Sequence, residues 1–513
     1  MINFRKNKRG YRAIKTKTST MKDDSAKGPS DAGFFLLAMI AITGGLFAPI
    51  LGFGFNLATD DVLFVLQNPL MKDVSLRGLF AVAASPGHVY GEIQPISYIS
   101  LWTDHALFGL AAWGYYLVQI LLHIANVTLV YFFIRSLTGN TLIAVATAMI
   151  FAIHPLQVDA VAMINQRKTL LFALFSLCSL LAYLRWEASE ARAWYISSLT
   201  LFVLALLSKS SAVVVPLLLV LIKLASAGGW TQRKSLSRLI PFFLLALLSG
   251  LATIVTESAA EQVHALKFGT VMGQFKLILL IYGDYFWSFF LPFNLSPAYI
   301  YRAEDVSSMR MASAVLFLAT ALALIVLGQR KRYWWLAWGT LWFVICLLPT
   351  SQLIPTTNLR QDHYMYLAII GPALIMGGAV HLLTARWEPQ RLYLPVILLV
   401  TVALGPLTFL HLEHYSNGLK YCERFEKTQG WIPALESIRG RVFLLIGEYR
   451  LAEACYIKTV ESFDEPLKSR ERFQLAQVYL RMGQKTRARE QLELIAPESP
   501  LKAEAERMFH DLQ

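Results

Sequence analysis

Long apolar segments, separated by short polar loops, constrain the fold of this chain more than any other feature of its sequence. A helix needs about 20 apolar residues to cross a membrane, and polytopic bundles also tolerate shorter or proline-broken spans. About 11 segments meet this requirement, namely 33–56, 113–134, 141–158, 169–185, 193–208, 211–227, 239–256, 311–328, 333–349, 364–384 and 392–411. We therefore expect an all-α fold, a polytopic membrane helix bundle. A purely soluble protein is excluded because 56% of the residues are hydrophobic and only 16% are charged.

The charged residues divide the chain into three parts. Residues 1–32 form a basic leader, since residues 1–24 carry eight Lys and Arg and only two Asp. Residues 33–412 form the apolar core, and residues 419–513 form a soluble tail with 16 basic and 15 acidic residues. The net charge of +13 therefore belongs mainly to the leader and the core, and we expect a membrane as partner and no nucleic acid.

The basic residues of the short loops predict which side of the membrane each loop faces, because Lys and Arg concentrate in cytoplasmic loops. The leader is therefore cytoplasmic, and the long loop 57–112 after the first span lies outside. A further apolar segment, 272–293, contains Lys276 and Asp284. As a full span it would place two basic loops outside, so we predict that it is re-entrant or interfacial. The spans then leave the tail outside, together with loop 57–112.

The tail carries a short repeat. Gly447 and Gly483 lie 36 residues apart, and each is followed five residues later by an alanine, Ala452 or Ala488. This spacing is close to the tetratricopeptide period of about 34 residues and predicts a tetratricopeptide-like helical repeat domain over 419–513. Such repeats form a concave surface for an extended peptide or another partner. A structural cap over the outer face of the core is an equally weighted alternative.

Two adjacent carboxylates, Asp60 and Asp61, follow the first span in the segment FNLATDDVLFVLQNP. Desolvation and mutual repulsion raise the pKa of one member of such a pair. A raised pKa suits a general base that takes a proton from an attacking hydroxyl, whereas the structural alternative is a solvated helix cap. The pair could also hold a divalent cation, although no further ligand accompanies it.

Several cations lie on the outer side, where the charge rule does not place them. Arg167 and Lys168 stand at the outer mouth of the fourth span, and Lys209 lies in a turn between two spans. Together with Arg360, they predict a site for an anionic phosphate at the membrane surface. Snorkelling toward lipid headgroups is the structural alternative. His154 also lies on the outer side, and Asp362, His363 and Tyr364 stand with Arg360 directly before a later span. For Tyr364 the structural alternative is the aromatic belt of a membrane interface.

Taken in order, these motifs resemble those of a known family. The Asp pair is followed by Asn68-Pro69, then by HPLQVDAVAMINQRKTLL, LLSKSSAVVVPLLL, LIPTTNLRQDHYMYLA and the repeat tail. This ordered set, which covers nearly the whole chain, resembles the transmembrane and tetratricopeptide-repeat O-mannosyltransferases and their bacterial relatives, which are GT-C glycosyltransferases. The chain departs from the family pattern at Gln94, where the family usually has Arg before Pro95, and at His363, where the family often has Arg.

The resemblance implies a GT-C transmembrane catalytic core over residues 33–412 and an inverting transferase. Its donor would be a polyprenyl-phosphate-linked sugar at the non-cytoplasmic membrane face, with no certain cofactor. Asp60 or Asp61 would be the base. The lipid phosphate would bind Arg167, Lys168, Lys209 and Arg360, and the substrate site would also include Gln94, His154, Asp362, His363 and Tyr364. The acceptor would be a protein Ser or Thr, displayed to the repeat domain, or a glycan of the cell envelope.

Two other functions fit parts of the sequence. A transporter or flippase of lipid-linked sugars would use the same outer cations, but transporters of that kind carry inverted repeats, which this sequence does not show. A membrane-anchored tetratricopeptide scaffold would leave the outer Asp, Arg and Lys clusters without a role. The chain also has no Walker loop, Rossmann signature or nucleophile elbow. We therefore expect an integral, multi-pass protein of a bacterial inner membrane, whose site and repeats face the periplasm.

Overall fold

The computed structural model describes residues 29–85, 89–225, 237–306, 309–330, 333–384 and 386–510. Within these ranges the chain is all-helical, and an isolated bridge between Val263 and Thr356 is its only β feature. The predicted all-α fold class is thus confirmed. The predicted basic leader lies, up to residue 28, outside the described residues.

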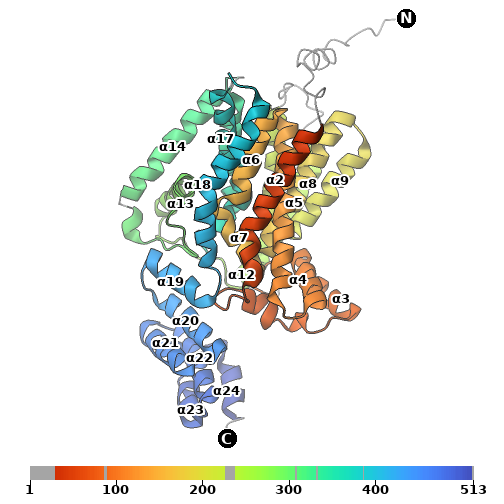
Figure 1. The fold of residues 1–513 in the computed structure, drawn as a ribbon. Coiled ribbons are helices and arrows are strands. Elements are labelled where there is room, and N and C mark those ends of the chain that lie inside the picture. The colour runs from red at the N-terminus through yellow and green to blue at the C-terminus, as the bar shows by residue number, and fades with distance from the viewer. Residues whose placement is uncertain are drawn as a thin grey trace, which may run out of the picture.

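The helices of the bundle follow the predicted apolar segments in chain order (Figure 1). They are α2 (Pro29–Phe47), α5 (Ala112–Thr138), α6 (Thr141–Ile153), α8 (Arg167–Ser189), α9 (Arg192–Leu206), α10 (Val215–Ala225), α12 (Ile240–Ala259), α13 (Val271–Phe290), α14 (Met309–Gly328), α15 (Trp334–Leu347), α17 (Ile370–Leu383) and α18 (Tyr393–Glu413). The loop between α2 and α5 folds into short helices, among them η3 (Val62–Leu66), α3 (Leu76–Ala84) and α4 (Pro95–Phe108).

Among the described residues, six helices are long and apolar enough to cross a membrane, or up to eight if each of two bent helix pairs makes one span. Three shorter apolar helices are Arg192–Leu206, Ser210–Leu224 and Trp334–Thr350. Each predicted span falls on one of these helices or bent pairs. The bends, of 56° and 53°, follow Ile153 and Ala368. Pro155 explains the first bend, since proline cannot continue a helix. The number of crossings stays a prediction.

The ambiguous segment 272–293 folds as a single unbroken helix, α13, which packs along α14. It therefore does not turn back on itself as a hairpin. In the described chain it is also not among the helices that are apolar enough to span a membrane. Its Asp284 forms an ion pair with Arg310 at 2.5 Å. The interfacial placement of α13 stays a prediction.

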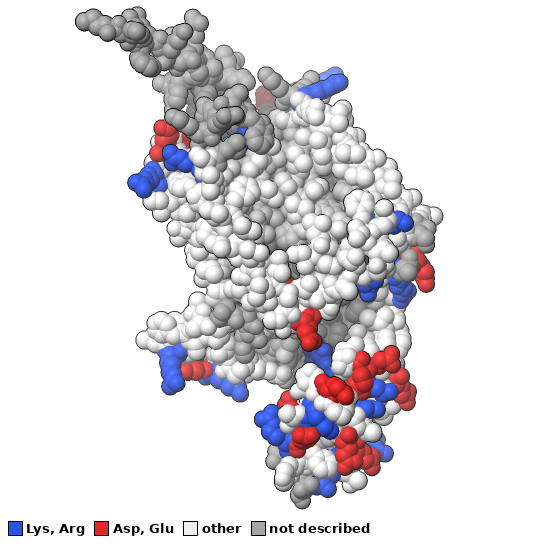
Figure 2. All heavy atoms as spheres, turned by 180° about the vertical axis from the view of Figure 1, so that it is seen from behind, with Lys and Arg blue, Asp and Glu red and all other residues white. Residues whose placement is uncertain are grey.

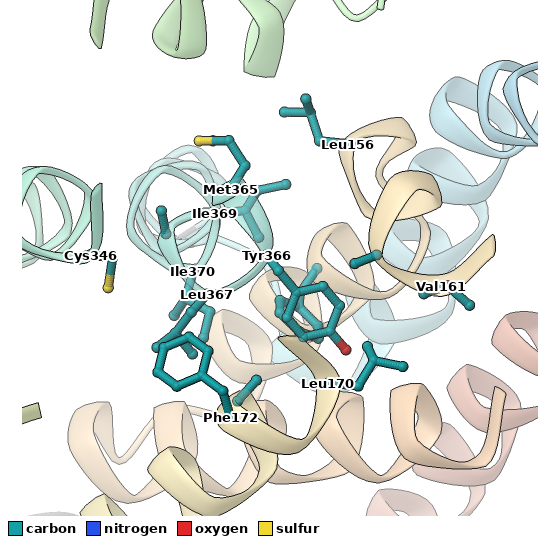
Figure 3. Close-up of a cluster of buried hydrophobic side chains, with 14 of the residues drawn as sticks. Leu156, Val161, Leu170, Phe172, Cys346, Met365, Tyr366, Leu367, Ile369 and Ile370 are labelled. Atoms are coloured by element: carbon teal, nitrogen blue, oxygen red, sulfur yellow. The ribbon is translucent and has the colours of Figure 1, made fainter. Parts of the chain in front are cut away.

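The bundle core lies where α5, α6, α8, α15 and α17 pack against one another. Figure 3 shows the buried side chains that converge there, with Leu170 from α8 next to Tyr366 and Phe172 from α8 next to Leu367. The Tyr366 hydroxyl lies 2.7 Å from Nδ1 of His123 and accepts a hydrogen bond from Asn126 at 3.1 Å. These contacts satisfy polar groups that an apolar interior would otherwise leave unpaired.

Two glycines allow α15 and α17 to approach closely. A Cβ on Gly371 would lie 2.2 Å from the carbonyl oxygen of Gly339, and a Cβ on Gly339 would lie 2.6 Å from the carbonyl oxygen of Gly371. Small residues at such crossings permit backbone contact between membrane helices.

The loop between α2 and α5 lies at the same end of the bundle as the tail (Figure 1). Charged side chains gather on the tail and at the ends of the bundle, and a broad band of uncharged surface lies between them (Figure 2). Such a band matches the apolar interior of a bilayer. The shared end agrees with the predicted placement of loop 57–112 and the tail on one side.

The tail is built from α19 (Gly418–Gln429), α20 (Pro433–Ile446), α21 (Tyr449–Ser462), α22 (Leu467–Arg481), α23 (Lys485–Glu493) and α24 (Lys502–His510). Helix α20 packs against α21, and α22 packs against α23. Gly447 ends α20 with φ 87°, and Gly483 follows α22 with φ 74°, a left-handed conformation that suits glycine. Ala452 and Ala488 are fully buried. The two helix pairs thus carry equivalent residues at equivalent places, while their tetratricopeptide classification stays a prediction.

Hydrogen bonds join the tail to the loops at this end of the bundle. Arg424 donates from Nε to the carbonyl oxygen of Leu295 at 2.8 Å. Arg441 donates from Nη2 to the carbonyl oxygen of Ala58 at 2.8 Å, two residues before Asp60. The tail therefore contacts the segment that carries the predicted base.

Candidate active site

Asp61, the second of the two adjacent carboxylates, links two segments of the backbone by hydrogen bonds. It is fully buried, and its carboxylate accepts N–H bonds from Asn165 at 2.9 Å and from Asn56 at 3.4 Å. Burial raises the pKa of Asp61 to about 7, against the effect of these two bonds. Asp61 therefore ties the loop after α2 to the segment that precedes α8.

Asp60 is half-buried and more open than its neighbour. Its Oδ1 accepts a hydrogen bond from the Tyr90 hydroxyl at 3.1 Å, and no other side-chain bond to it is found in the described part of the chain. Burial raises the pKa of Asp60, whereas Lys168 and Arg441 act to lower it. The backbone oxygen of Asp60 accepts the N–H group of Leu63 at 2.9 Å, which fixes the start of η3. A carboxylate with spare acceptor capacity and a raised pKa has the features of a general base.

Lys168, in the first turn of α8, forms an ion pair with Glu92 from the loop between α3 and α4. Burial alone would raise the pKa of Glu92, but Lys168, helped by Lys209 and His363, lowers it. Gln94 donates from Nε2 to Glu92 at 2.9 Å, while the Oε1 atom of Gln94 is buried without a partner among the described atoms. The loop before α4 thus brings a carboxylate and an amide to the lysines.

Lys209 lies in the turn after α9, close to Lys168. Its ammonium donates to the Thr169 hydroxyl at 2.9 Å and lies 5.4 Å from the centre of the Tyr364 ring. Burial lowers the pKa of Lys209 to about 7, and the neighbouring positive charge of Lys168 acts in the same direction. An added anion would therefore stabilise the positive charge of Lys209, which burial and Lys168 destabilise.

His363 and Asp362 both point into buried surroundings near the bend before α17. Nδ1 of His363 lies 2.7 Å from Oδ2 of Asp159, and the His363 backbone N–H group donates to the same oxygen at 3.0 Å. The contact at Nδ1 fixes the orientation of the imidazole ring. Asp362 accepts a hydrogen bond from the Tyr299 hydroxyl at 2.8 Å.

Arg167 is fully engaged within the protein. Its guanidinium is completely buried and forms an ion pair with Asp104 at 2.6 Å. It also donates to the Gln119 side chain at 2.7 Å, to the Ser100 hydroxyl at 2.8 Å and to the carbonyl oxygen of Tyr115 at 3.0 Å. Arg167 therefore joins α4 and α5 to the start of α8 and has little capacity left for a phosphate.

Two further predicted residues lie apart from Asp60. His154 contacts the carbonyl oxygen of Phe289 through Nε2 at 2.9 Å and accepts the Leu156 N–H group at 3.2 Å, so both ring nitrogens are used. Arg360 is held by the Ser288 hydroxyl at 2.5 Å and lies 3.7 Å above the centre of the Tyr299 ring. Through these contacts with Phe289 and Ser288, both residues tie their segments to α13.

The structure therefore brings together Asp60, Gln94, Lys168, Lys209, His363 and Tyr364 around Glu92 and Tyr90. Tyr90 and Glu92 were not among the sequence-based candidates. A tyrosine and a carboxylate in the same outer loop as Gln94 are weak signals, because only the fold shows that they meet Asp60 and Lys168. Asp159 stands inside the motif HPLQVDAV, but its pairing with His363 spans 204 residues.

The described residues contain no group of three or more His, Cys, Asp or Glu that could hold a metal ion. A divalent cation on the Asp60/Asp61 pair would therefore need ligands from its substrate or from water. A metal at this position stays a prediction.

Comparisons with known proteins give a consistent picture. Residues 95–256 match the family model described as dolichyl-phosphate-mannose-protein mannosyltransferase. A Caenorhabditis elegans protein named protein O-mannosyl-transferase F38B6.6 is 24% identical over 423 residues, which cover 77% of this chain and 59% of that relative. The mouse protein O-mannosyl-transferase TMTC2 is 36% identical over 104 residues, 20% of this chain and 12% of its own length. No solved structure matches the chain.

The chain thus spans about three fifths of the length of its nematode relative and less of the mouse protein. The resemblance to the transmembrane and tetratricopeptide-repeat O-mannosyltransferases is confirmed by these matches. Together with the apolar helices, they identify an integral membrane protein. The family match begins at Pro95 and includes Lys168 and Lys209.

Proposed function

We propose that this chain is an inverting glycosyltransferase that moves a sugar from a polyprenyl-phosphate-linked donor to a hydroxyl group of a protein. The observation that carries the proposal is the arrangement of a half-buried carboxylate, Asp60, near Lys168, which in turn lies near Lys209, at one end of an apolar bundle. A base and a phosphate-binding pair at a membrane surface are the two elements that this reaction needs.

Asp60 is the base in this mechanism. The acceptor hydroxyl oxygen attacks the anomeric carbon, its proton passes to Asp60, and the bond between the anomeric carbon and the phosphate oxygen breaks. Attack from the face opposite the phosphate inverts the configuration. The Tyr90 hydroxyl at 3.1 Å orients the Asp60 carboxylate. Asp61 is unsuited to this role because it is fully buried and its two oxygens already accept backbone N–H bonds.

Lys168 and Lys209 receive the departing phosphate. Negative charge develops on the phosphate oxygen as its bond to the sugar breaks, and fixed cations nearby stabilise that charge. In the free protein Lys168 is paired with Glu92, so an arriving phosphate shares or replaces this partner. The lipid phosphate is a stable leaving anion, and the mechanism therefore requires no separate protein acid.

The remaining predicted residues act by positioning. Arg167 fixes the start of α8, and with it Lys168, through its ion pair with Asp104. His363, Tyr364 and Gln94 lie near the lysines and would contact the sugar headgroup. His154 and Arg360 order the segments that they join to α13.

The names of the relatives favour mannose as the sugar and a protein as the acceptor. The basic leader, the charge of the short loops and the shared end of loop 57–112 and the tail favour the non-cytoplasmic face as the location of the site. In a bacterium this face is the periplasmic side of the inner membrane. The proposal includes a tetratricopeptide-like repeat domain over 419–513 on that side.

Sugar transfer by the purified chain tests this function. The wild-type protein in lipid nanodiscs is incubated with radiolabelled mannosyl polyprenyl phosphate and Ser- or Thr-containing peptides, and the product is analysed for its linkage and anomeric configuration. We expect O-linked sugar with a configuration opposite to that of the donor. Retained configuration would exclude the single displacement. Movement of the lipid across vesicles without any sugar transfer would instead support the transporter alternative.

A further inference from the structure

A groove of about 1020 Å³ lies between the helical tail and the segment that follows Asp61. Leu63 and Gln67 line it from the bundle, and residues of α20, α21, α22 and α24 line it from the tail. We call this space the tail groove. Neither the proposed base nor the phosphate-binding lysines line it.

The walls of the tail groove carry positive charge and no negative charge. Three of its lining residues are arginines, Arg441, Arg470 and Arg481, and none is Asp or Glu. Arg470 and Arg481 are exposed and form no hydrogen bond or ion pair through their side chains within the described chain. Arg441 uses Nη2 to bind Ala58, and its Nε is buried without a partner among the described atoms.

Several arginines elsewhere on the tail are paired with carboxylates. Arg439 contacts Glu426 at 2.5 Å and Glu436 at 2.9 Å, and Arg487 contacts Glu453 at 3.2 Å. The tail as a whole is nearly neutral, so the unpaired arginines of the groove do not reflect a generally basic surface. Unpaired cations concentrated in one concave surface favour a ligand that carries carboxylates.

The other lining residues suit a polypeptide in an extended conformation. Gln67, Gln474 and Gln477 present side-chain amides that can donate to and accept from a peptide backbone. Leu445 and Ile446 line the same groove and are 39% and 48% exposed. A groove lined by both amide and apolar side chains can bind the backbone and the side chains of an extended peptide.

One end of the tail groove adjoins Asp60. The Leu63 N–H group donates to the backbone oxygen of Asp60 at 2.9 Å. The Tyr90 hydroxyl binds the Asp60 carboxylate, and Arg441 and Arg470 are close enough to Tyr90 for their positive charges to act on its pKa. A chain lying along the groove would therefore have residues next to the proposed base.

We propose that the tail groove binds an extended acidic segment of the acceptor polypeptide and thereby presents a nearby Ser or Thr hydroxyl to Asp60. This inference rests on the proposed function and adds a substrate class to it. Arg470 and Arg481 bind carboxylates of this segment, the glutamines bind the peptide backbone, and Asp60 removes the hydroxyl proton.

The test compares two fluorescent peptides that share a central Thr and differ in having either Glu or Lys at the flanking positions. Binding is measured by fluorescence anisotropy on the full-length protein in nanodiscs of neutral lipid. We expect the wild type to bind the Glu peptide about tenfold more tightly than the Lys peptide, with a difference that shrinks as salt is added. The Asp60→Asn variant should bind the Glu peptide as the wild type does.

The double variant Arg470→Glu/Arg481→Glu should reverse the preference and bind the Lys peptide more tightly. A reversed preference cannot come from misfolding, which would abolish binding of both peptides. The matched control is Arg450→Glu, because Arg450 is an exposed arginine of α21 that does not line the groove. It should keep the wild-type preference.

The outcomes separate this inference from the proposed function. Equal binding of both peptides by the wild type, or an unchanged preference in the double variant, would overturn the groove assignment even if sugar is transferred. Conversely, the expected binding pattern without sugar transfer from any lipid-linked donor would sustain the groove and contradict the glycosyltransferase.

Discussion

At the residue scale, neighbouring polar side chains of the candidate site make different contacts and therefore have different roles. Asp60 and Asp61 are chemically identical neighbours, and only the fold shows that Asn165 binds the second of them. Arg167 and Lys168 are adjacent too, yet one is enclosed by Asp104 and the other faces Glu92. Such differences arise from contacts between distant segments, which spacing along the chain cannot reveal.

Removal of the Arg167 guanidinium should destabilise the protein rather than weaken donor binding alone. In Arg167→Ala the buried Asp104 would lose its partner, and breaking a buried pair in this way costs about 3–5 kcal/mol. We expect a clearly lower unfolding temperature in detergent, measured by size-exclusion chromatography of samples after heating. Arg185→Ala, at an exposed position of the same helix, is the control and should be neutral. A normally stable Arg167→Ala protein with weak donor binding would instead make Arg167 a phosphate ligand.

The pH dependence of the reaction should report Lys209. Because burial lowers the pKa of Lys209 to about 7, this side chain is charged below that pH and neutral above it. The kcat/KM value for the donor, which reflects the free enzyme, should therefore fall as the pH rises through about 7. Arginine stays protonated throughout this range, so Lys209→Arg should lose this alkaline limb. An unchanged alkaline limb in that variant would assign it to another group.

At the scale of elements, hydrophobic segments predicted the helices well because apolar length leaves few other structures in a membrane. The bends after Ile153 and Ala368 were harder to predict from the sequence, because only the first of them is marked by a proline, Pro155. Segment 272–293 was the element that the sequence predicted least well. Its charged residues suggested a broken or interfacial path, whereas Asp284 is neutralised by Arg310 and the helix runs unbroken.

The contact between α15 and α17 should be sensitive to a single methyl group. In Gly371→Ala the new Cβ would meet the Gly339 carbonyl oxygen at 2.2 Å, and overpacking of this kind costs about 1–3 kcal/mol. We expect a lower unfolding temperature in detergent. Gly45→Ala, where nothing lies within 4 Å of the added Cβ, is the matched control and should not destabilise. Equal unfolding temperatures for Gly371→Ala and the wild type would mean that the helices separate freely.

At the scale of the whole molecule, the sequence predicted a bundle followed by a helical tail. It also predicted that the tail and loop 57–112 lie on the same side of the membrane. It could not predict that the tail would reach the loop after α2. That contact depends on Arg441, which donates to the backbone oxygen of Ala58, while Arg424 joins the tail to Leu295 in the segment after α13. Every residue has a backbone carbonyl oxygen, so the sequence does not show which of these oxygens will accept a hydrogen bond. The tail groove and its proximity to Asp60 therefore emerge only from the assembled fold.

Labelling of single cysteines should report the orientation of the molecule in a membrane. Lys72→Cys in the loop after α2 and Arg450→Cys in the tail lie at exposed positions of one end, and Arg185→Cys lies near the opposite end of the bundle (Figure 1). In intact spheroplasts a membrane-impermeant maleimide should label the first two variants only, and Arg185→Cys should react after permeabilisation. The wild-type protein is the control for its native cysteines, three of which are buried. The reverse pattern would place the site in the cytoplasm.

The central claim is that Asp60 is the base for sugar transfer, and the most direct measurement is the single-turnover rate of Asp60→Asn. The variant and the wild type are compared at saturating mannosyl polyprenyl phosphate and acceptor peptide, with equal unfolding temperatures as the condition for comparison. Loss of a general base lowers such rates by about 100-fold or more, and we predict a loss of that size with donor binding retained. A folded Asp60→Asn protein that transfers sugar within twofold of the wild-type rate would contradict the mechanism.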